Sequence, residues 1–287
     1  MENTLYDYSA IIERKPFKLP NNARVGVWII LTIEYFDIGL PIPTPEGMSS
    51  TIPDLPLYAS RDYGNRVGIW RIIEVLDKYD IKATVVINAD ICEHYPVIVE
   101  ECKKRGWEFV CHANTNSQFP FLGSVNETEQ RDIISKSMTA VTKATGQRPK
   151  GWRSPGFSSN FHTPDILVET GVRYMSDWSN DDQPFPINVK NGSLICLPSD
   201  QVDDLRFPHM CSADYYNTLK DHFDTLYHDG ATQARTFGFC VHTFAIGRPH
   251  RIGVLDKILQ YMRSHNDVWF ATGWEIASWY YENYLGA

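Results

Sequence analysis

The chain has 287 residues, of which 43% are hydrophobic and 22% charged, and its formal net charge is −8. This composition excludes a disordered or fibrous protein, and the negative charge argues against nucleic acid or an anionic membrane surface as the main partner. The length suits one large α/β domain with a substantial core.

The first strong pattern is the run from Val25 to Asp37, V-G-V-W-I-I-L-T-I-E-Y-F-D. Apolar residues stand at odd and even positions up to Ile33, which predicts a strand buried on both faces, as in a parallel sheet. Glu34 follows where this run ends. Catalytic groups of α/β folds stand at such strand ends, although a carboxylate there also suits the start of a solvated loop.

The flanking segments differ from this strand. Residues 1–24 are expected to form an N-terminal arm. The Pro-rich stretch from Asp37 to Tyr63 predicts a long loop, of the kind that is functional or covers a neighbouring subunit.

Beyond this loop, strand and helix patterns alternate, which predicts βα units around a parallel sheet. Further strands are expected at 81–88, 107–112, 150–155, 171–177, 194–198, 236–242 and 268–271. Helices are expected at 66–79, 94–105, 127–146, 163–170, 213–230, 251–266 and 273–284. Since no repeat or linker interrupts the pattern, we expect a single domain over residues 1–287.

The N-terminus has no basic segment followed by an apolar run, and the six cysteines form no C-x-x-C pair. These features predict reduced thiols and a cytoplasmic location.

Polar residues recur at the carboxyl ends of the predicted strands: Glu34, His112, Arg153, Asp177 and His242. In a parallel sheet these ends meet at one rim. A lone histidine is usually structural, but two histidines with a carboxylate and an arginine at equivalent strand ends predict an active site. The corresponding roles are a carboxylate base, an arginine that keeps it ionised and a histidine acid.

The order of these motifs resembles the polysaccharide deacetylase (NodB-type, carbohydrate esterase) superfamily, and most of all its branch of metal-independent allantoinases and related cyclic imide hydrolases. The resemblance rests on K-P-F-K-L-P-N-N-A-R at 15–24, D-Y-G-N-R-V-G-I-W-R at 62–71, D-W-S-N-D-D-Q-P-F at 177–185 and H-T-F-A-I-G-R-P-H-R at 242–251. It implies a distorted (β/α) barrel of about seven parallel strands.

The resemblance also implies roles for individual residues. Glu34 matches the catalytic base, Arg153 the arginine that orients it, and His242 the general acid. One of Asp177, Asp181 and Asp182 is then expected to orient His242.

Further residues are expected to bind the substrate. Trp178 and Asp182 belong to the fourth motif, while Tyr63 and Arg66 either line the site or form only a turn followed by a surface arginine.

The family's three zinc ligands fall on Tyr35, His112 and Asn116, of which only His112 is a strong ligand. Zinc normally takes three protein ligands, so the resemblance implies that no cofactor is required. A divalent ion such as Zn²⁺, held weakly by His112 and Glu34, remains an alternative. In the metal-free case Tyr35, His112 and Asn116 are expected to bind substrate.

The resulting expectation is a hydrolase of a non-peptide C–N bond in a small cyclic amide, imide or ureide. The alternatives are a metal-dependent N-deacetylase of amino sugars and a binding protein whose catalysis has decayed. A small-molecule substrate, no nucleic acid or membrane partner, and a homodimer or homotetramer are expected. The oligomer follows from the Pro-rich loop and the aromatic C-terminal helix, which offer apolar surface.

Overall fold

The computed structural model describes residues 2–44, 47–117, 122–199 and 202–285. Its strands are β1 (Val25–Ile33), β2 (Pro43–Thr44), β3 (Gly47–Met48), β4 (Ala83–Ile87), β5 (Glu108–Cys111), β6 (Gly151–Trp152), β7 (Tyr174–Met175), β8 (Phe185–Ile187), β9 (Leu194–Cys196), β10 (Arg235–His242) and β11 (Val268–Phe270). Its helices are α1 (Leu55–Tyr63), α2 (Ile69–Lys78), α3 (Ala89–His94), α4 (Pro96–Lys104), α5 (Glu127–Thr145), α6 (Thr163–Glu169), α7 (Ser212–Asp229), α8 (Ile252–Arg263) and α9 (Gly273–Tyr280).

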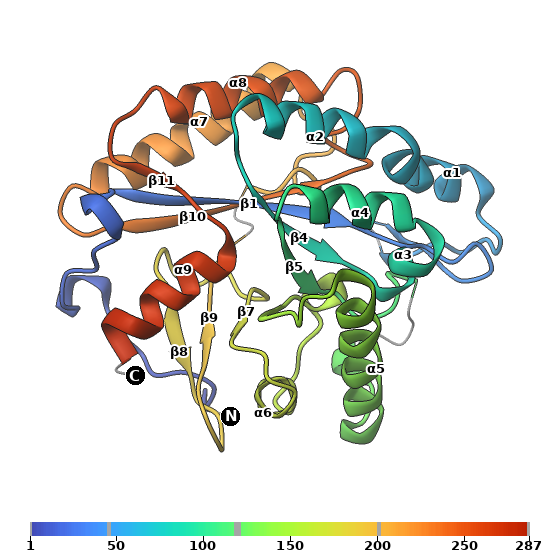
Figure 1. Cartoon of the computed structure of the whole chain (residues 1–287), viewed down its shortest axis with the longest axis horizontal. Helices are drawn as coiled ribbons and strands as arrows, with labels where there is room; N and C mark the ends of the chain where they lie inside the picture. The colour runs from blue at the N-terminus through green and yellow to red at the C-terminus, as the bar shows by residue number, and fades with distance from the viewer. Residues whose placement is uncertain (1, 45–46, 118–121, 200–201, 286–287) are drawn as a thin grey trace.

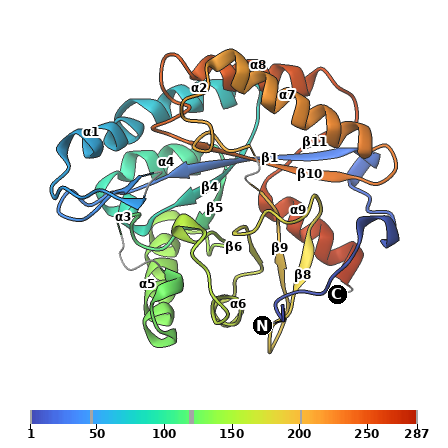
Figure 2. The same ribbon diagram turned by 180° about the vertical axis from the view of Figure 1, so that it is seen from behind.

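One curled sheet forms the centre of the molecule, with strand order β10-β1-β4-β5-β6-β7-β9-β8 and β11 beside β1. Within this sheet every pair is parallel except β8 with β9. Helices α2, α7 and α8 form a layer over β1 and β10 in both views (Figures 1 and 2). The expected α/β fold, a distorted barrel, is confirmed, and its sheet is left open between the end strands β10 and β8 in the described part of the chain.

Strand β1 determines where the reactive residues lie. All of its residues are buried, as expected for a strand covered on both faces. It pairs in parallel with β10, in a register that sets Thr32 opposite His242, and with β4, in a register that ends at Ile33 opposite Ile87. Glu34 therefore leaves the sheet beside His242.

The Pro-rich stretch is not the continuous loop that the sequence predicts. It contains the β2–β3 pair and helix α1, and residues 45–46 lie outside the described part. Helix α1 continues through a π-helical turn, Gly64–Gly68, into α2. The predicted helix at 66–79 is thus the second half of a longer helical segment that starts at Leu55.

Two glycines let this helical segment lie against the loop that follows His242. A Cβ atom at Gly64 would lie 2.4 Å from the Thr243 Oγ1 atom, and one at Gly68 would lie 2.0 Å from the Thr243 carbonyl oxygen. Neither distance is sterically allowed, so glycine at these positions is what permits the contact.

Other elements differ from the prediction in smaller ways. The helix expected at 94–105 corresponds to α4, which starts at Pro96, and the separate helix α3 that precedes it was not predicted. Strand β8 was not predicted. It is short and its middle residue, Pro186, has no backbone N–H to donate, which weakens the strand signal.

The aromatic residues of the C-terminal helix pack within the chain, which differs from the surface expected for subunit contacts. The Trp279 Nε1–H donates to the Lys18 carbonyl oxygen at 2.8 Å, and the Tyr284 hydroxyl accepts the Lys18 N–H at 2.6 Å. The rings of Tyr280 and Tyr284 pack around Phe17. This helix therefore holds the N-terminal arm.

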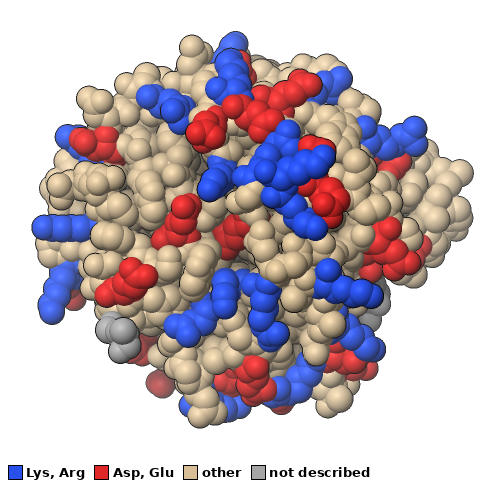
Figure 3. All heavy atoms as spheres, viewed as in Figure 1, with Lys and Arg blue, Asp and Glu red and all other residues tan. Residues whose placement is uncertain are grey.

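The surface shows no single-sign patch on the face in Figure 3, where basic and acidic side chains are interspersed. Among the described residues, no helix is long and apolar enough to cross a membrane.

We expect Gly68→Ala to destabilise the protein by about 1–3 kcal/mol, because the added methyl group must displace the Thr243 backbone. The free energy of unfolding in urea measures this. Gly253→Ala in α8 is the control, since a Cβ there meets no atom within 4 Å; it should be neutral or stabilising by up to ~1 kcal/mol. Equal stabilities of the two variants would contradict the packing argument.

Candidate active site

Glu34 lies at the centre of the site. Its side chain is only 7% exposed, and its Oε1 atom lies 3.8 Å from Nε2 of His112 and 3.8 Å from Nε2 of His242. Burial alone would raise the pKa of Glu34, but His112, His242 and the positive charge of Arg61 outweigh it and hold that pKa below its usual value. Glu34 is therefore ionised at neutral pH.

Amide side chains fix the backbone around this carboxylate. The Asn65 Nδ2–H donates to the Glu34 carbonyl oxygen at 2.9 Å. Asn88 accepts the Tyr35 N–H at 2.8 Å and donates to the His112 carbonyl oxygen and to the Asn116 Oδ1 atom. The ends of β1, β4 and β5 are thereby held in one arrangement.

His242 is held by Asp204, a fully buried carboxylate. The Nδ1 atom of His242 lies 2.6 Å from the Asp204 Oδ1 atom, and the Oδ2 atom accepts the backbone N–H groups of His242 and Ile246 at 2.9 and 3.0 Å. Burial by itself would lower the pKa of His242, but Asp204, Glu34 and Asp203 outweigh it and raise that pKa to about 9. His242 is therefore protonated at neutral pH.

The second histidine, His112, has its Nδ1 atom 2.7 Å from the Arg153 carbonyl oxygen. Because a carbonyl oxygen only accepts, Nδ1 carries the proton. The Nε2 atom of His112 is then the one that faces Glu34.

These groups open into a cavity of about 380 Å³, a size that suits a small ligand. Its wall combines polar groups with aromatic and proline side chains, and the lining residues are Thr32, Glu34, Phe36, Pro43, Arg61, His112, Asn116, Arg153, Ser154, Pro155, Gly156, Phe157, Asp203, Leu205, Arg206, His242 and Phe244. The structure thus brings together five of the residues predicted from sequence, and they are Glu34, His112, Asn116, Arg153 and His242.

The aspartate that orients His242 is not one of the three predicted from sequence. Asp177 accepts the Ser154 N–H at 2.8 Å, Asp181 pairs with Arg14 at 2.6 Å, and Asp182 is 36% exposed with Arg235 at 3.9 Å. None of these three contacts His242; Asp204 does. The physical reason is that the Nδ1 atom of His242 faces the segment after β9, whereas the three predicted aspartates follow β7.

Arg153 also differs from its predicted role. It lines the cavity, but it donates to the Ser176 carbonyl oxygen at 3.1 Å and to the Ser199 hydroxyl at 2.9 Å. These contacts join the ends of β6, β7 and β9, while the groups that lower the pKa of Glu34 are His112, His242 and Arg61.

Five residues predicted to bind substrate lie outside the cavity lining, and they are Tyr35, Tyr63, Arg66, Trp178 and Asp182. The Tyr35 ring stacks on His94 with centroids 4.6 Å apart, because it follows Glu34 and points to the other side of the chain. Trp178 packs on Tyr6, with ring centroids 5.5 Å apart.

Tyr63 is the last residue of α1, and Arg66 lies in the π-helical turn that follows it. The Tyr63 hydroxyl accepts from Arg71, and the side chain of Arg66 is 73% exposed. Arg66 is thus the surface arginine of the alternative, although the segment is helical and not a simple turn.

The sequence prediction missed Arg61, Asp204 and Cys240. Arg61 lay inside the presumed loop. The doublet Asp203–Asp204 lies in an irregular segment between β9 and α7, so no strand-end pattern marked it. Cys240 stands two residues before His242, so a strand directs both side chains to the same face.

Tyr35, His112 and Asn116, which occupy the zinc-ligand positions of the polysaccharide deacetylases, do not form a zinc site. Tyr35 is turned onto His94, and the Asn116 Oδ1 atom accepts a hydrogen bond from Asn88 at 3.3 Å. His112 and Glu34 are the remaining strong ligands of this group. The donor set therefore does not fit a three-ligand zinc centre.

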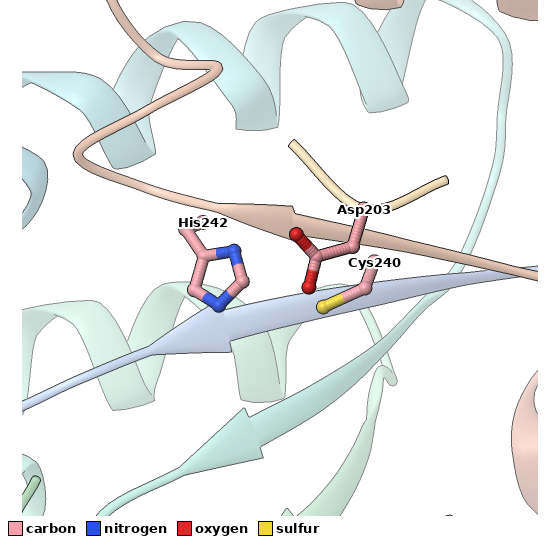
Figure 4. Close-up of side chains that lie close together, drawn as sticks. All are labelled: Asp203, Cys240 and His242. Carbon is pink, nitrogen blue, oxygen red and sulfur yellow. The ribbon is translucent and has the colours of Figure 1, made fainter. Parts of the chain in front are cut away.

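A second group of potential ligands, Asp203, Cys240 and His242, has one atom from each within 4.8 Å of the others (Figure 4). The Asp203 Oδ1 atom already accepts the N–H groups of Leu205 and Arg206 at 2.6 and 3.1 Å. The Arg153 guanidinium lies 3.6 Å from the Cys240 Sγ atom. Because this positive charge adjoins the thiol, we assign no cation to the group.

Comparisons with known proteins agree with this fold. The polysaccharide deacetylase family model matches residues 53–175. A protein of Schizosaccharomyces pombe that bears the name of a polysaccharide deacetylase is 28% identical, over 90% of both chains.

Two solved structures are similar along almost the whole chain. One, from Pseudomonas aeruginosa and described as a probable polysaccharide deacetylase, is 24% identical with a TM-score of 0.83, covering 93% of this chain and 94% of its own. The other, the allantoinase PuuE, is 23% identical with a TM-score of 0.86, covering 98% of this chain and 100% of its own. Both support the fold. The family model and the relative show that the chain is similar to polysaccharide deacetylases.

Proposed function

We propose that the protein hydrolyses a C–N bond in the ring of a small cyclic amide, imide or ureide. The observation that carries the proposal is that Glu34 and His242 lie 3.8 Å apart in a cavity of about 380 Å³. Their surroundings lower the pKa of Glu34 and raise that of His242 to about 9. One group accepts a proton and the other donates one, which is what hydrolysis of an amide requires.

In the proposed mechanism Glu34 takes a proton from water, and the oxygen of that water attacks the ring carbonyl carbon. His242 then gives its Nε2 proton to the leaving nitrogen, and Asp204 stabilises the imidazolium beforehand. The Asn116 amide accepts a hydrogen bond through its Oδ1 atom, so its N–H groups are available to the carbonyl oxygen of the substrate.

The class of substrate follows from the donor set. Without a three-ligand zinc centre, water is activated only by a carboxylate, so a ring carbonyl that is strained or electronically activated suits the site better than an acetamide. The similarity to an allantoinase structure along 98% of the chain supports this choice.

Deacetylation of an amino sugar is the second candidate, because the Schizosaccharomyces pombe relative bears the name of a deacetylase. A screen of succinimide, hydantoin, allantoin and chitooligosaccharides separates the two candidates. Hydrolysis of the chitooligosaccharides alone would favour deacetylation.

The pKa of His242 should depend on Asp204. In the wild-type protein the imidazole should titrate near pH 9 by NMR. In Asp204→Asn the favourable charge is lost while burial remains, so this pKa should fall by roughly 1–3 units. Asp182→Asn, in an exposed and distant carboxylate, is the control and should leave it unchanged. An unaltered pKa in Asp204→Asn would show that Asp204 does not hold the proton on His242.

The pH dependence of kcat/KM should be bell-shaped, because catalysis needs Glu34 deprotonated and His242 protonated. Activity should rise with pH through the lowered pKa of Glu34 and fall through pH 9 as His242 loses its proton. Glu34→Gln should reduce kcat by roughly 10²–10⁴ and abolish the acid limb.

The matched control for this experiment is Glu74→Gln, an exposed glutamate of α2. It should retain both limbs and the wild-type kcat. Near wild-type kcat in Glu34→Gln would mean that another group is the base.

Prolonged chelation should leave the activity intact, because two of the three zinc-ligand positions of the family are Tyr35 and Asn116. The measurement is kcat/KM before and after dialysis against EDTA, with metal analysis of the same samples. Complete loss of activity that added Zn²⁺ restores would refute the metal-independent mechanism and would indicate a site at Glu34 and His112.

A further inference from the structure

Arg61 projects from α1 into the wall of the catalytic cavity, where it has firm support. Its guanidinium group lies 4.2 Å from the centre of the Phe244 ring and 5.6 Å from that of Phe36. The Nη2 atom donates to the Pro43 carbonyl oxygen at 3.1 Å. The side chain is therefore held in position before any ligand binds.

Among the residues that the structure describes, no carboxylate forms an ion pair with Arg61. No Asp or Glu oxygen of the described residues lies within the 4.0 Å of an ion pair, and its Nε atom is buried with no hydrogen-bond partner. Burial lowers the pKa of Arg61, which reflects the cost of removing this cation from water. An arginine has five N–H donors, and here a single backbone carbonyl is the acceptor.

A buried arginine, Arg251, shows the contrast with the partly buried Arg61. Arg251 donates to the carbonyl oxygens of Phe207, Pro208 and Met210 at 3.0, 2.9 and 3.0 Å, and it does not line the cavity. Its contacts are those of a structural residue that closes a loop. Arg61 has one such contact and lines the cavity that contains Glu34 and His242.

The two acidic residues in the described lining of the cavity are already engaged. Glu34 lies between two imidazoles, and the Asp203 Oδ1 atom accepts two backbone N–H groups. Arg206 lies at the exposed edge of the same cavity and adds a further positive charge to those of Arg61 and Arg153. The charge left for a ligand is therefore positive.

We propose that Arg61 binds a carboxylate on the substrate, so that the substrate is a cyclic amide or imide carrying an anionic substituent. This rests on the proposed function for the choice of ring. A carboxylate held by the planar guanidinium forms charge-assisted hydrogen bonds, and it would orient the ring so that its carbonyl meets Glu34. The proposal makes Arg61 a specificity-determining residue.

Two probes of equal size test this, hydantoin-5-acetate and hydantoin-5-acetamide, which share a ring and differ in charge. Binding is measured by calorimetry at pH 8 on a Glu34→Gln background, which prevents turnover. This background should bind the acetate roughly 10- to 100-fold more tightly than the acetamide, the range for a hydrogen bond to a charged group. Adding Arg61→Met should remove that preference, mainly by weakening binding of the acetate.

The matched control is Arg263→Met on the same background. Arg263 also lies over a phenylalanine ring, at 5.8 Å from Phe270, and donates to one carbonyl oxygen, that of Tyr79 at 2.9 Å, but outside the cavity. It should keep the full preference. Arg61→Lys retains the charge without the planar fork and should keep part of it, which tests the role of Arg61 even if the methionine variant fails to fold.

Equal binding of the two probes, no detectable binding of either, or a preference that survives Arg61→Met would overturn the assignment. Turnover by the wild-type protein is a separate measurement. If the acetate binds selectively through Arg61 but no ring is opened, the proposed hydrolysis fails while the carboxylate site stands.

Discussion

The arrangement of the site depends on keeping one carboxylate ionised where little water reaches it. Burying the charge of Glu34 is costly unless positive groups surround it. His242 meets this need only while protonated, and burial opposes its protonation. Asp204 reverses that effect, and its own charge is satisfied by two backbone N–H groups. Negative and positive groups thus alternate from Glu34 through His242 to Asp204, and the backbone N–H groups of His242 and Ile246 complete the series.

The helical segment from α1 to α2 supports this arrangement from one side. Asn65 fixes the carbonyl of Glu34, and two glycines let the helix approach Thr243, the neighbour of His242. Since π-helical turns often occur at functional sites, the turn at Gly64–Gly68 fits a segment that must satisfy both contacts. Most of the D-Y-G-N-R-V-G motif therefore acts by positioning residues of the site.

Much of the fold and the centre of the site could be predicted from sequence, because both depend on local pattern. A run of apolar residues at both odd and even positions predicted β1. Polar residues at the ends of predicted strands identified Glu34, His112, Arg153 and His242. Asp204 could not be found in this way, since it belongs to an irregular segment whose approach to β10 depends on the curl of the sheet. Arg61 was missed because proline-rich sequence hid the start of α1 at Leu55, where Pro56 occupies the first turn of the helix.

The pairing of β1 has a consequence for how the chain reaches its native state. During synthesis, the neighbouring strand β4 follows soon after β1. Strands β10 and β11 are synthesised some two hundred residues later, as the pairing of Val25 with Arg235 and Val268 shows. Until those strands form, the most apolar strand of the protein has an unpaired edge that favours association with other chains. Such long-range pairing slows folding and makes the late partners necessary for solubility as well as for catalysis. The pairing of β1 with β10 brings Glu34 close to His242. Because this pairing forms late, it also leaves the nascent protein prone to aggregation until then.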